Sequence, residues 1–107
     1  MEGQLVVLCT VGKPDEAEGI ARALVEGRLA ACVNVVPRIV SVYRWKGAVE
    51  RDEESLLVIK TRAERFEALR AAIVARHAYE VPEIVALPLV GGHAPYLAWL
   101  DESVAER

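Results

Sequence analysis

The stretch "AACVNVVPRIVSVYRW" (residues 30–45), with "KG" (46–47) and "AVERDEESLLVIKT" (48–61) after it, decides the fold. The first run is rich in valine, the second becomes apolar toward its end, and the Lys-Gly pair between them favours a tight turn. They predict a β-hairpin with arms of about fifteen residues, whereas a strand usually has five or six. Because Pro37 cannot donate a ladder hydrogen bond, the first arm should be an edge strand or carry a bulge. A small body cannot cover such arms, so the tip should protrude and its free edge invites pairing with another chain.

The segments on the N-terminal side of the hairpin predict one strand and one helix. "QLVVLCT" (4–10) is apolar on both faces, which is typical of a central strand. "KPDEAEGIARALVEG" (13–27) has Pro14 where a helix begins and Gly27 where one ends. Helical spacing gives this segment one apolar face, formed by Ala17, Ile20, Ala21, Leu24 and Val25.

The segments after the hairpin predict a helix, a strand and a closing helix. In "TRAERFEALRAAIVARH" (61–77), Thr61 and Glu64 have the spacing of a capping box. "EIVALPLV" (83–90) predicts a strand and "APYLAWLDESVAE" (94–106) a final helix. The inner face of the first of these helices should be formed by Phe66, Leu69 and Ile73.

The order of these elements predicts an α+β fold in a single domain over residues 1–107. The first six elements follow the split βαβ, or ferredoxin-like, pattern, and a C-terminal helix is added to it. In that pattern the first strand lies between the third and fourth, and the second strand lies at an edge. Cys9 and Cys32 would then lie on strands that are not neighbours, beyond the reach of a disulfide, so two free thiols are expected.

Composition excludes several classes of protein. With 53% hydrophobic and 27% charged residues, the chain of 107 residues is not expected to be disordered. A net charge of -3 argues against a nucleic-acid or anionic-membrane partner. We find no signal-peptide pattern and no membrane span, and we expect a cytoplasmic protein. No nucleophile elbow, phosphate loop or dinucleotide fingerprint is present, so enzymatic chemistry is not indicated.

Two groups of polar residues are candidates for a site. Cys9 or Cys32 with His77 would make a soft site suited to copper, although a cysteine is more often a buried small hydrophobe and such a histidine more often a solvent-facing helix end. Lys60, Tyr79 and Glu83 could meet at one end of the sheet, with an ion pair between Lys60 and Glu83. Aromatic side chains are common in interfaces, so Tyr43 and Trp45 near the hairpin turn more often mark an interface than a cofactor site.

Five segments together carry a resemblance to a known family. They are "VVLCT" (6–10), "EGRLAACVNVVP" (26–37), "SVYRWKGAVERDEESLLVIKT" (41–61), "HAYEVPEIVALPL" (77–89) and "YLAWLDES" (96–103). In this order, over about residues 5 to 104, the sequence resembles the divalent-cation tolerance proteins of the CutA family. The resemblance implies a ferredoxin-like subunit in a tight homotrimer. Long hairpins would pair between subunits, in an architecture similar to that of the PII signalling proteins.

The resemblance also implies roles for individual residues. A copper site credited to some members uses the cysteine that corresponds to Cys9 and two adjacent histidines, the second of which corresponds to His77. Arg76 stands at the position of the first histidine, and an arginine cannot serve as a ligand at ordinary pH. Cys32 matches a frequent family cysteine. The expected cleft between subunits includes Lys60, Tyr79, Glu83, Trp45 and Cys32.

Three hypotheses follow from the residues and the resemblance. The leading one is a non-enzymatic homotrimer that binds copper or another divalent cation through Cys9 and His77. The second is a PII-like sensor that holds a small anionic metabolite in the cleft between subunits, with Lys60 as its cation. The third is a stable trimeric scaffold for protein interaction.

Overall fold

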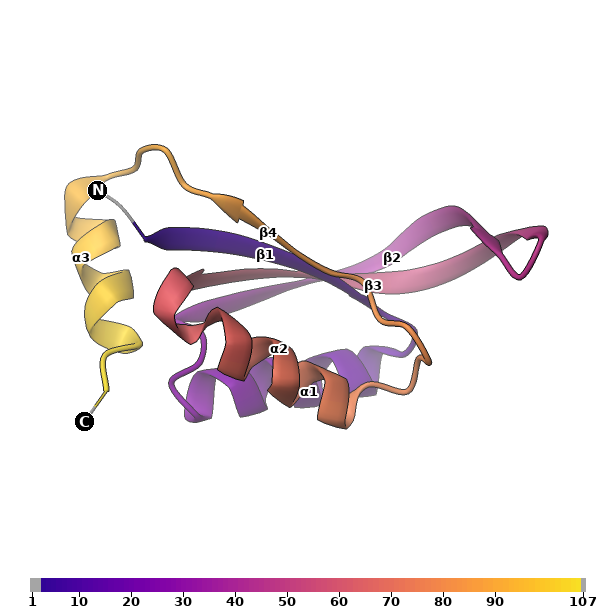
Figure 1. Cartoon of the computed structure of the whole chain (residues 1–107), viewed down its shortest axis with the longest axis horizontal. Coiled ribbons are helices and arrows are strands. Elements are labelled where there is room, and N and C mark those ends of the chain that lie inside the picture. Colours follow the sequence, from indigo (N-terminus) through magenta and orange to yellow (C-terminus); the bar gives the residue numbers. More distant parts are fainter. Residues whose placement is uncertain (1–2, 107) are drawn as a thin grey trace.

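A four-stranded antiparallel sheet carries two helices on one face, and a third helix lies across one end (Figure 1). The computed structural model describes residues 3–106. Its elements are β1 (Gln4–Val11), α1 (Pro14–Glu26), β2 (Cys32–Trp45), β3 (Ala48–Arg62), the short 3-10 helix η1 (Ala63–Arg65), α2 (Phe66–Arg76), β4 (Ile84–Pro88) and α3 (Ala94–Ser103). The sheet order β2-β3-β1-β4 places β1 between β3 and β4 and β2 at an edge, which confirms the predicted topology. Within residues 3–106, no helix is long and apolar enough to cross a membrane.

The hairpin of β2 and β3 is as long as the sequence predicted. It pairs from Cys32 opposite Lys60 to Trp45 opposite Ala48, and its register shifts at Pro37 and Arg38, between Val36 and Ile39. The edge position and the bulge are therefore both confirmed. The two turn residues at positions 46 and 47 have φ angles of 50° and 85°, a turn that matches the right-handed twist of the arms. Figure 1 shows the outer half of the hairpin extending past α1 and α2, and the longest dimension of the molecule is 44 Å.

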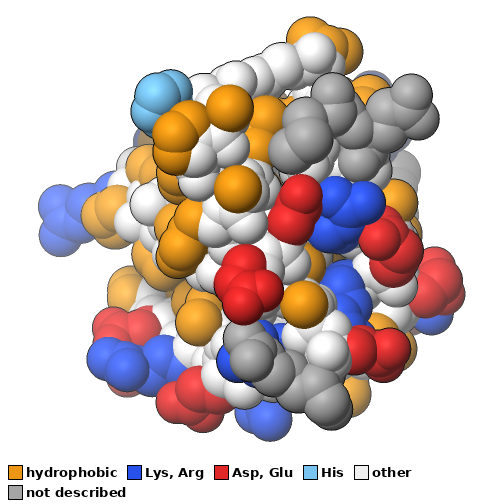
Figure 2. Space-filling model, turned by 90° about the vertical axis from the view of Figure 1, so that its left-hand side faces the viewer, with side chains coloured by type: hydrophobic (Ala, Val, Ile, Leu, Met, Phe, Trp, Pro, Cys, Tyr) orange, Lys and Arg blue, Asp and Glu red, His pale blue; other side chains and the backbone are white. Residues whose placement is uncertain are grey.

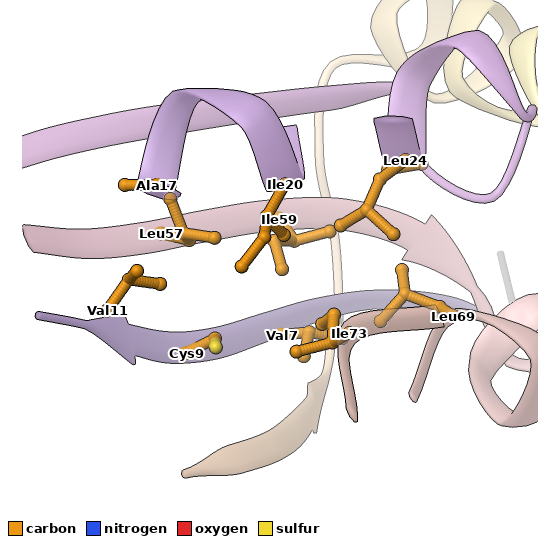
Figure 3. Close-up of a cluster of buried hydrophobic side chains, with 11 residues drawn as sticks. Val7, Cys9, Val11, Ala17, Ile20, Leu24, Leu57, Ile59, Leu69 and Ile73 are labelled. Carbon is orange, nitrogen blue, oxygen red and sulfur yellow. The ribbon is translucent and has the colours of Figure 1, made fainter. Parts of the chain in front are cut away.

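The main core lies between the sheet and the pair α1 and α2 (Figure 3). Because side chains alternate along a strand, every second residue of β1 and β3 faces this core. Its buried side chains are Val7, Cys9 and Val11 of β1, Leu57 and Ile59 of β3, Ala17, Ile20 and Leu24 of α1, Leu69 and Ile73 of α2, and Ala30. The predicted helix faces are thus confirmed, except that Val25 is 42% exposed at the C-terminal end of α1.

The predicted capping box is wrong, and the reason lies in β3. Thr61 is the next-to-last residue of that strand and is fully buried, and its hydroxyl donates a hydrogen bond of 2.6 Å to the carbonyl oxygen of Leu29. Glu64 instead pairs with Arg62 at 3.0 Å. Because the strand continues to Arg62 and η1 follows it, the α-helix begins at Phe66 rather than at residue 61. The last strand and the last helix are also shorter than the predicted ranges 83–90 and 94–106.

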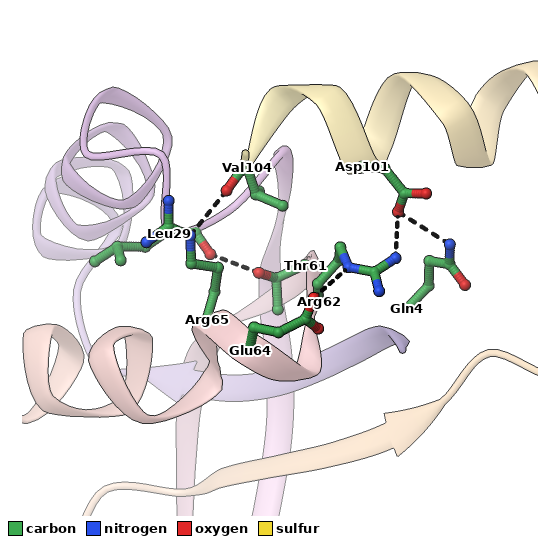
Figure 4. Close-up of polar contacts among 8 residues, drawn as sticks. All are labelled: Gln4, Leu29, Thr61, Arg62, Glu64, Arg65, Asp101 and Val104. Carbon is green, nitrogen blue, oxygen red and sulfur yellow. Dashed lines mark hydrogen bonds and ion pairs between the residues drawn. The ribbon is translucent and has the colours of Figure 1, made fainter. Parts of the chain in front are cut away.

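A partly buried polar cluster attaches helix α3 to the sheet (Figure 4). The carboxylate of Asp101 accepts hydrogen bonds from Arg62 at 2.7 Å and from the side-chain amide of Gln4 at 3.0 Å. The guanidinium of Arg65 donates to the carbonyl oxygen of Val104 at 2.8 Å. Figure 2 shows this end of the molecule, where hydrophobic side chains are exposed among charged ones. The cluster therefore fixes α3 at the start of β1 and the end of β3.

Candidate functional site

Cys9 lies inside the core rather than at a surface. Its side chain is 0% exposed, and the thiol points to the carbonyl oxygen of Thr10 at 3.7 Å. Burial, together with the negative charges of Glu83, Glu54 and Glu16, raises the pKa of this thiol to about 12. Cys9 and Cys32 are both free thiols, as the sequence predicted. Cys9 is therefore a protonated, protected sulfur in this conformation.

His77 directly follows α2, and both of its ring nitrogens take part in hydrogen bonds. Its Nε2 lies 2.7 Å from the carbonyl oxygen of Thr10, and the backbone N–H of Tyr79 donates to Nδ1 at 3.1 Å. Because Nδ1 accepts a hydrogen bond, the proton of the neutral imidazole resides on Nε2, which donates to Thr10. The imidazole also contacts the Tyr79 ring, with centroids 4.6 Å apart. His77 thus holds the segment after α2 against the end of β1.

The structure brings Cys9 and His77 together, because both approach the same carbonyl oxygen of Thr10. They do not form a complete metal site. No group of three or more His, Cys, Asp or Glu side chains that could hold a metal ion occurs within residues 3–106. Arg76, the position where the resemblance implies another histidine, is an exposed residue at the end of α2. The pair supplies two donors, and each is already engaged in a hydrogen bond.

Lys60 does not meet Tyr79 and Glu83 within this chain. Its ammonium contacts the side-chain oxygen of Asn34 and lies 4.0 Å from the sulfur of Cys32. Lys60 is six residues from Glu54 along β3, which separates it from the Tyr79 end of the sheet by roughly 20 Å at ~3.3 Å per residue. The expected ion pair with Glu83 is therefore wrong for a single chain.

One cavity near the end of β1 is lined by three of the predicted residues, Tyr79, Glu83 and Trp45. The cavity has a volume of about 640 Å³ and lies between the hairpin and the segment 78–83. Its lining includes Glu54 and Glu80 in addition, with Tyr43, Ser41, Val42, Thr10, Ala78 and Val81. Three carboxylates and three aromatic rings thus face one space, and no lysine or arginine is among the residues that line it.

A hydrogen bond between Tyr79 and Glu54 closes the inner end of this cavity. The phenol donates to Oε2 of Glu54 at 2.8 Å, and burial and this bond to a carboxylate raise the pKa of Tyr79 well above its ordinary value. The ring passes directly over Gly12. A Cβ at that position would lie 2.9 Å from the phenol oxygen, closer than packing allows. The absence of a side chain at Gly12 is therefore what lets Tyr79 reach Glu54.

Sequence reasoning missed Glu54 and Gly12. Glu54 is one of four consecutive acidic and polar positions in "DEES" (52–55), and its burial is what distinguishes it from the exposed carboxylates of Asp52 and Glu53. Strand alternation places it on the same face as Lys60, but nothing local predicts that segment 78–83 folds over it. Gly12 directly follows β1, where a glycine usually signals only a turn.

Comparison with known proteins identifies the family. The model of the family described as CutA1 divalent ion tolerance protein matches residues 5–103, nearly the whole chain. The chain belongs to this CutA1 family. The divalent-cation tolerance protein CutA of Thermus thermophilus is 53% identical over 98 residues, which cover 92% of this chain and 95% of that protein. The chloroplastic protein CutA 1 of rice is 46% identical over 95% of this chain, but the match spans only 58% of the longer rice protein.

Solved CutA structures have the same fold. The CutA1 structure of Oryza sativa superposes with a TM-score of 0.94 at 45% identity, covering 98% of this chain and 96% of that one. The Cut A1 structure of Thermus thermophilus gives a TM-score of 0.93 at 51% identity, covering 95% and 99%. The resemblance seen in the sequence is confirmed at the level of family and subunit fold.

Proposed function

We propose that this CutA family member is a non-enzymatic homotrimer with a PII-like architecture that acts in the cytoplasm in the response to divalent cations. The observation that carries the assembly is a sheet with an open apolar face. Helices α1 and α2 cover one face only (Figure 1). A sheet needs a partner for each apolar face, and a second copy of the chain is the simplest one. Two free cysteines agree with a cytoplasmic location.

The open face is apolar across three strands. Leu8 of β1 lies between Val85 of β4 and Val58 of β3, and in the next row Val6 lies beside Leu87. Val85 is 47% and Leu87 49% exposed, far more than side chains of this kind in a core. Contiguous apolar surface of this type on a folded protein marks an interaction site.

The hairpin supplies the second element of the proposed assembly. The outer edge of β2 has no strand beside it among the described residues, because β2 is the terminal strand of the sheet. An edge of this length presents unpaired backbone groups that can bond to a strand of another chain. Pairing of these edges between subunits would cover them and fix the register of the trimer.

A pair of matched variants tests the assembly. Leu87→Glu places a charge on the open face, whereas Val74→Glu places one on the solvent side of α2, where Val74 is 48% exposed. We expect light scattering to show a trimer for the wild type and for Val74→Glu, and dissociated subunits for Leu87→Glu. A Leu87→Glu protein that keeps the wild-type mass would remove the open face from the interface.

For the divalent cation we propose copper, with Cys9 and His77 as ligands. The Cys9 thiol and the His77 imidazole approach one carbonyl oxygen, which supports this, since soft sulfur and nitrogen donors suit copper. The two residues alone do not fit a closed site, so a third ligand must come from water or a neighbouring subunit. Copper must also displace the proton of a thiol whose pKa is about 12.

Calorimetric titration with Cu²⁺ tests this site. Wild type should bind, Cys9→Ala and His77→Ala should each lose most of the affinity, and Cys32→Ala serves as the matched control. Equal binding by wild type and Cys9→Ala would show that any copper site lies elsewhere.

A second candidate function is that of a small-molecule sensor, and the cavity next to Tyr79 and Glu54 favours it. A concave site of about 640 Å³ with aromatic walls and a few polar groups is typical of a ligand site. The anionic metabolite expected from the sequence requires a cation, and in this chain Lys60 lies elsewhere. An anion would therefore need Lys60 of another subunit. If Lys60→Ala leaves thermal stabilisation by anionic metabolites unchanged, that form of the hypothesis fails.

A further inference from the structure

The charge of the cavity beside Tyr79 points to a ligand of the opposite sign from the one expected from the sequence. Its lining carries the carboxylates of Glu54, Glu80 and Glu83 and no positively charged side chain. An anion entering this space would face like charges at short range, where Coulomb repulsion is strong in a partly buried site. A cation would be attracted by Glu54 and Glu83, whereas Glu80 already pairs with Lys46.

Glu54 is the residue that makes this a built site rather than an acidic patch on the surface. The residue is only 8% exposed, and its one described partner is the neutral phenol of Tyr79. None of the ion pairs formed within residues 3–106 includes Glu54 or Glu83. Because a buried carboxylate is costly without a counter-charge, the inner end of the cavity favours a positive group beside Glu54.

Two of the lining residues, Trp45 and Glu80, already contact an ammonium group that lies outside the lining. The Nζ atom of Lys46, in the hairpin turn, lies 5.5 Å from the centroid of the Trp45 ring and 3.6 Å from a carboxylate oxygen of Glu80. An ammonium between an aromatic face and a carboxylate is the arrangement that cation–π attraction and charge pairing favour. Glu54, which is buried, and Glu83, which is exposed, line the same cavity, and neither takes part in an ion pair within residues 3–106.

The composition of the lining also distinguishes an organic cation from a metal ion. A metal needs several converging ligands, and no group of three or more suitable side chains occurs in the described part of the chain. The walls contributed by Tyr43, Trp45, Tyr79, Val42 and Val81 are aromatic or apolar. Such walls bury an apolar group, while the carboxylates bind the charge attached to it.

We propose that this cavity binds a protonated amine that carries an aromatic or apolar group, with the ammonium on Glu54 and Glu83 and the apolar part against the aromatic walls. The proposal deepens the sensor function and rests on it, because it names the class of ligand for that site. The cavity is formed within one chain, so binding does not need the ammonium of Lys60.

Three probes that share one ring system test the sign of the charge directly. Tryptamine is a cation, tryptophol is neutral and indole-3-acetate is an anion. Isothermal titration at pH 7 should show tryptamine binding at least tenfold more tightly than the other two. Glu54→Gln and Glu83→Gln should each weaken tryptamine at least tenfold. Glu67→Gln, which removes an exposed carboxylate of α2, should leave it unchanged.

We expect both glutamine variants to fold like the wild type. A glutamine at position 54 still offers an oxygen to the Tyr79 phenol, and Glu83 is exposed, so its replacement disturbs no core. Circular dichroism of each variant checks this. The proposal is overturned if wild type does not bind tryptamine, if indole-3-acetate binds as tightly, or if both substitutions leave the affinity unchanged. Light scattering on the same samples tests the assembly separately. A trimer that does not bind the amine would contradict the ligand proposal and leave the proposed assembly intact.

Discussion

Cys9 should be almost inert toward alkylation in the folded protein, because it is 0% exposed and its pKa is raised from 9.0 to about 12. At pH 8, a thiol with a pKa of 9.0 is about one-tenth thiolate, whereas one with a pKa of 12 has about one thiolate in ten thousand. Since only the thiolate attacks iodoacetamide, the chemical factor alone slows Cys9 by roughly a thousandfold. Lack of access to the core slows it further.

The assay follows the alkylation of each cysteine by peptide mass spectrometry, in buffer and in a denaturing concentration of urea. The alkylation rate of Cys9 in urea, where the chain is unfolded, is the reference for its rate in buffer. No comparison with Cys32 is therefore needed. We expect the native rate to be at least a thousandfold lower. A native rate within tenfold of the rate in urea would refute the buried, protonated thiol.

The same shift predicts how stability depends on pH. The pKa is higher in the folded state than the ordinary value, so the folded protein holds this proton more tightly than the unfolded chain does. The stabilising effect is complete below pH 9 and is lost as the pH rises toward 12. It amounts to at most about 4 kcal/mol at ~1.4 kcal/mol per pKa unit. The fall in unfolding free energy over this range should be smaller by that amount in Cys9→Ala, as urea titrations at several pH values can measure.

Three further substitutions test other contacts. Thr61→Val keeps the shape of a fully buried side chain but removes the hydrogen bond to Leu29. The free energy of unfolding in urea should fall by about 1–2 kcal/mol. An unchanged free energy would mean that this bond contributes nothing. Gly12→Ala should push the Tyr79 ring away from Glu54, so its phenol pKa should move back toward 10 in an ultraviolet titration, and an unchanged pKa would contradict the close contact. Asp101→Asn should cost about 1 kcal/mol at pH 7, because it weakens the attachment of α3. Burial opposes ionisation of Asp101, but the hydrogen bonds from arginine and glutamine outweigh it and lower its pKa. Its contribution should therefore decline as the pH falls below about 4, and a difference between wild type and variant that stays constant with falling pH would contradict this.

Local patterns were sufficient to predict most of the fold. Pro37 marked both the edge strand and the bulge, and Pro14 and Gly27 marked the ends of α1, because each acts through its own backbone geometry. The capping-box prediction for Thr61 was wrong because the same spacing to Glu64 also occurs when Thr61 lies at the end of a strand. Only the position of Leu29 shows where its hydroxyl bonds.

The candidate site was predicted less well, because its parts come together through tertiary structure. Three of the residues predicted from the sequence line one cavity, namely Tyr79, Glu83 and Trp45, and their role in a site stays a prediction. Lys60 lies on β3, six residues beyond Glu54, so strand geometry places it toward the other end of the sheet, beside Asn34. The sign of the cavity's charge follows from that separation and from the burial of Glu54, which no local pattern reveals.

Sedimentation equilibrium of the wild-type protein at micromolar concentration tests the proposed assembly most directly. The open apolar face and the exposed edge of β2 predict one species with three times the subunit mass of 11.7 kDa. A single species of 11.7 kDa would contradict the account, because the sheet face that carries Val85 and Leu87 would then remain exposed to water.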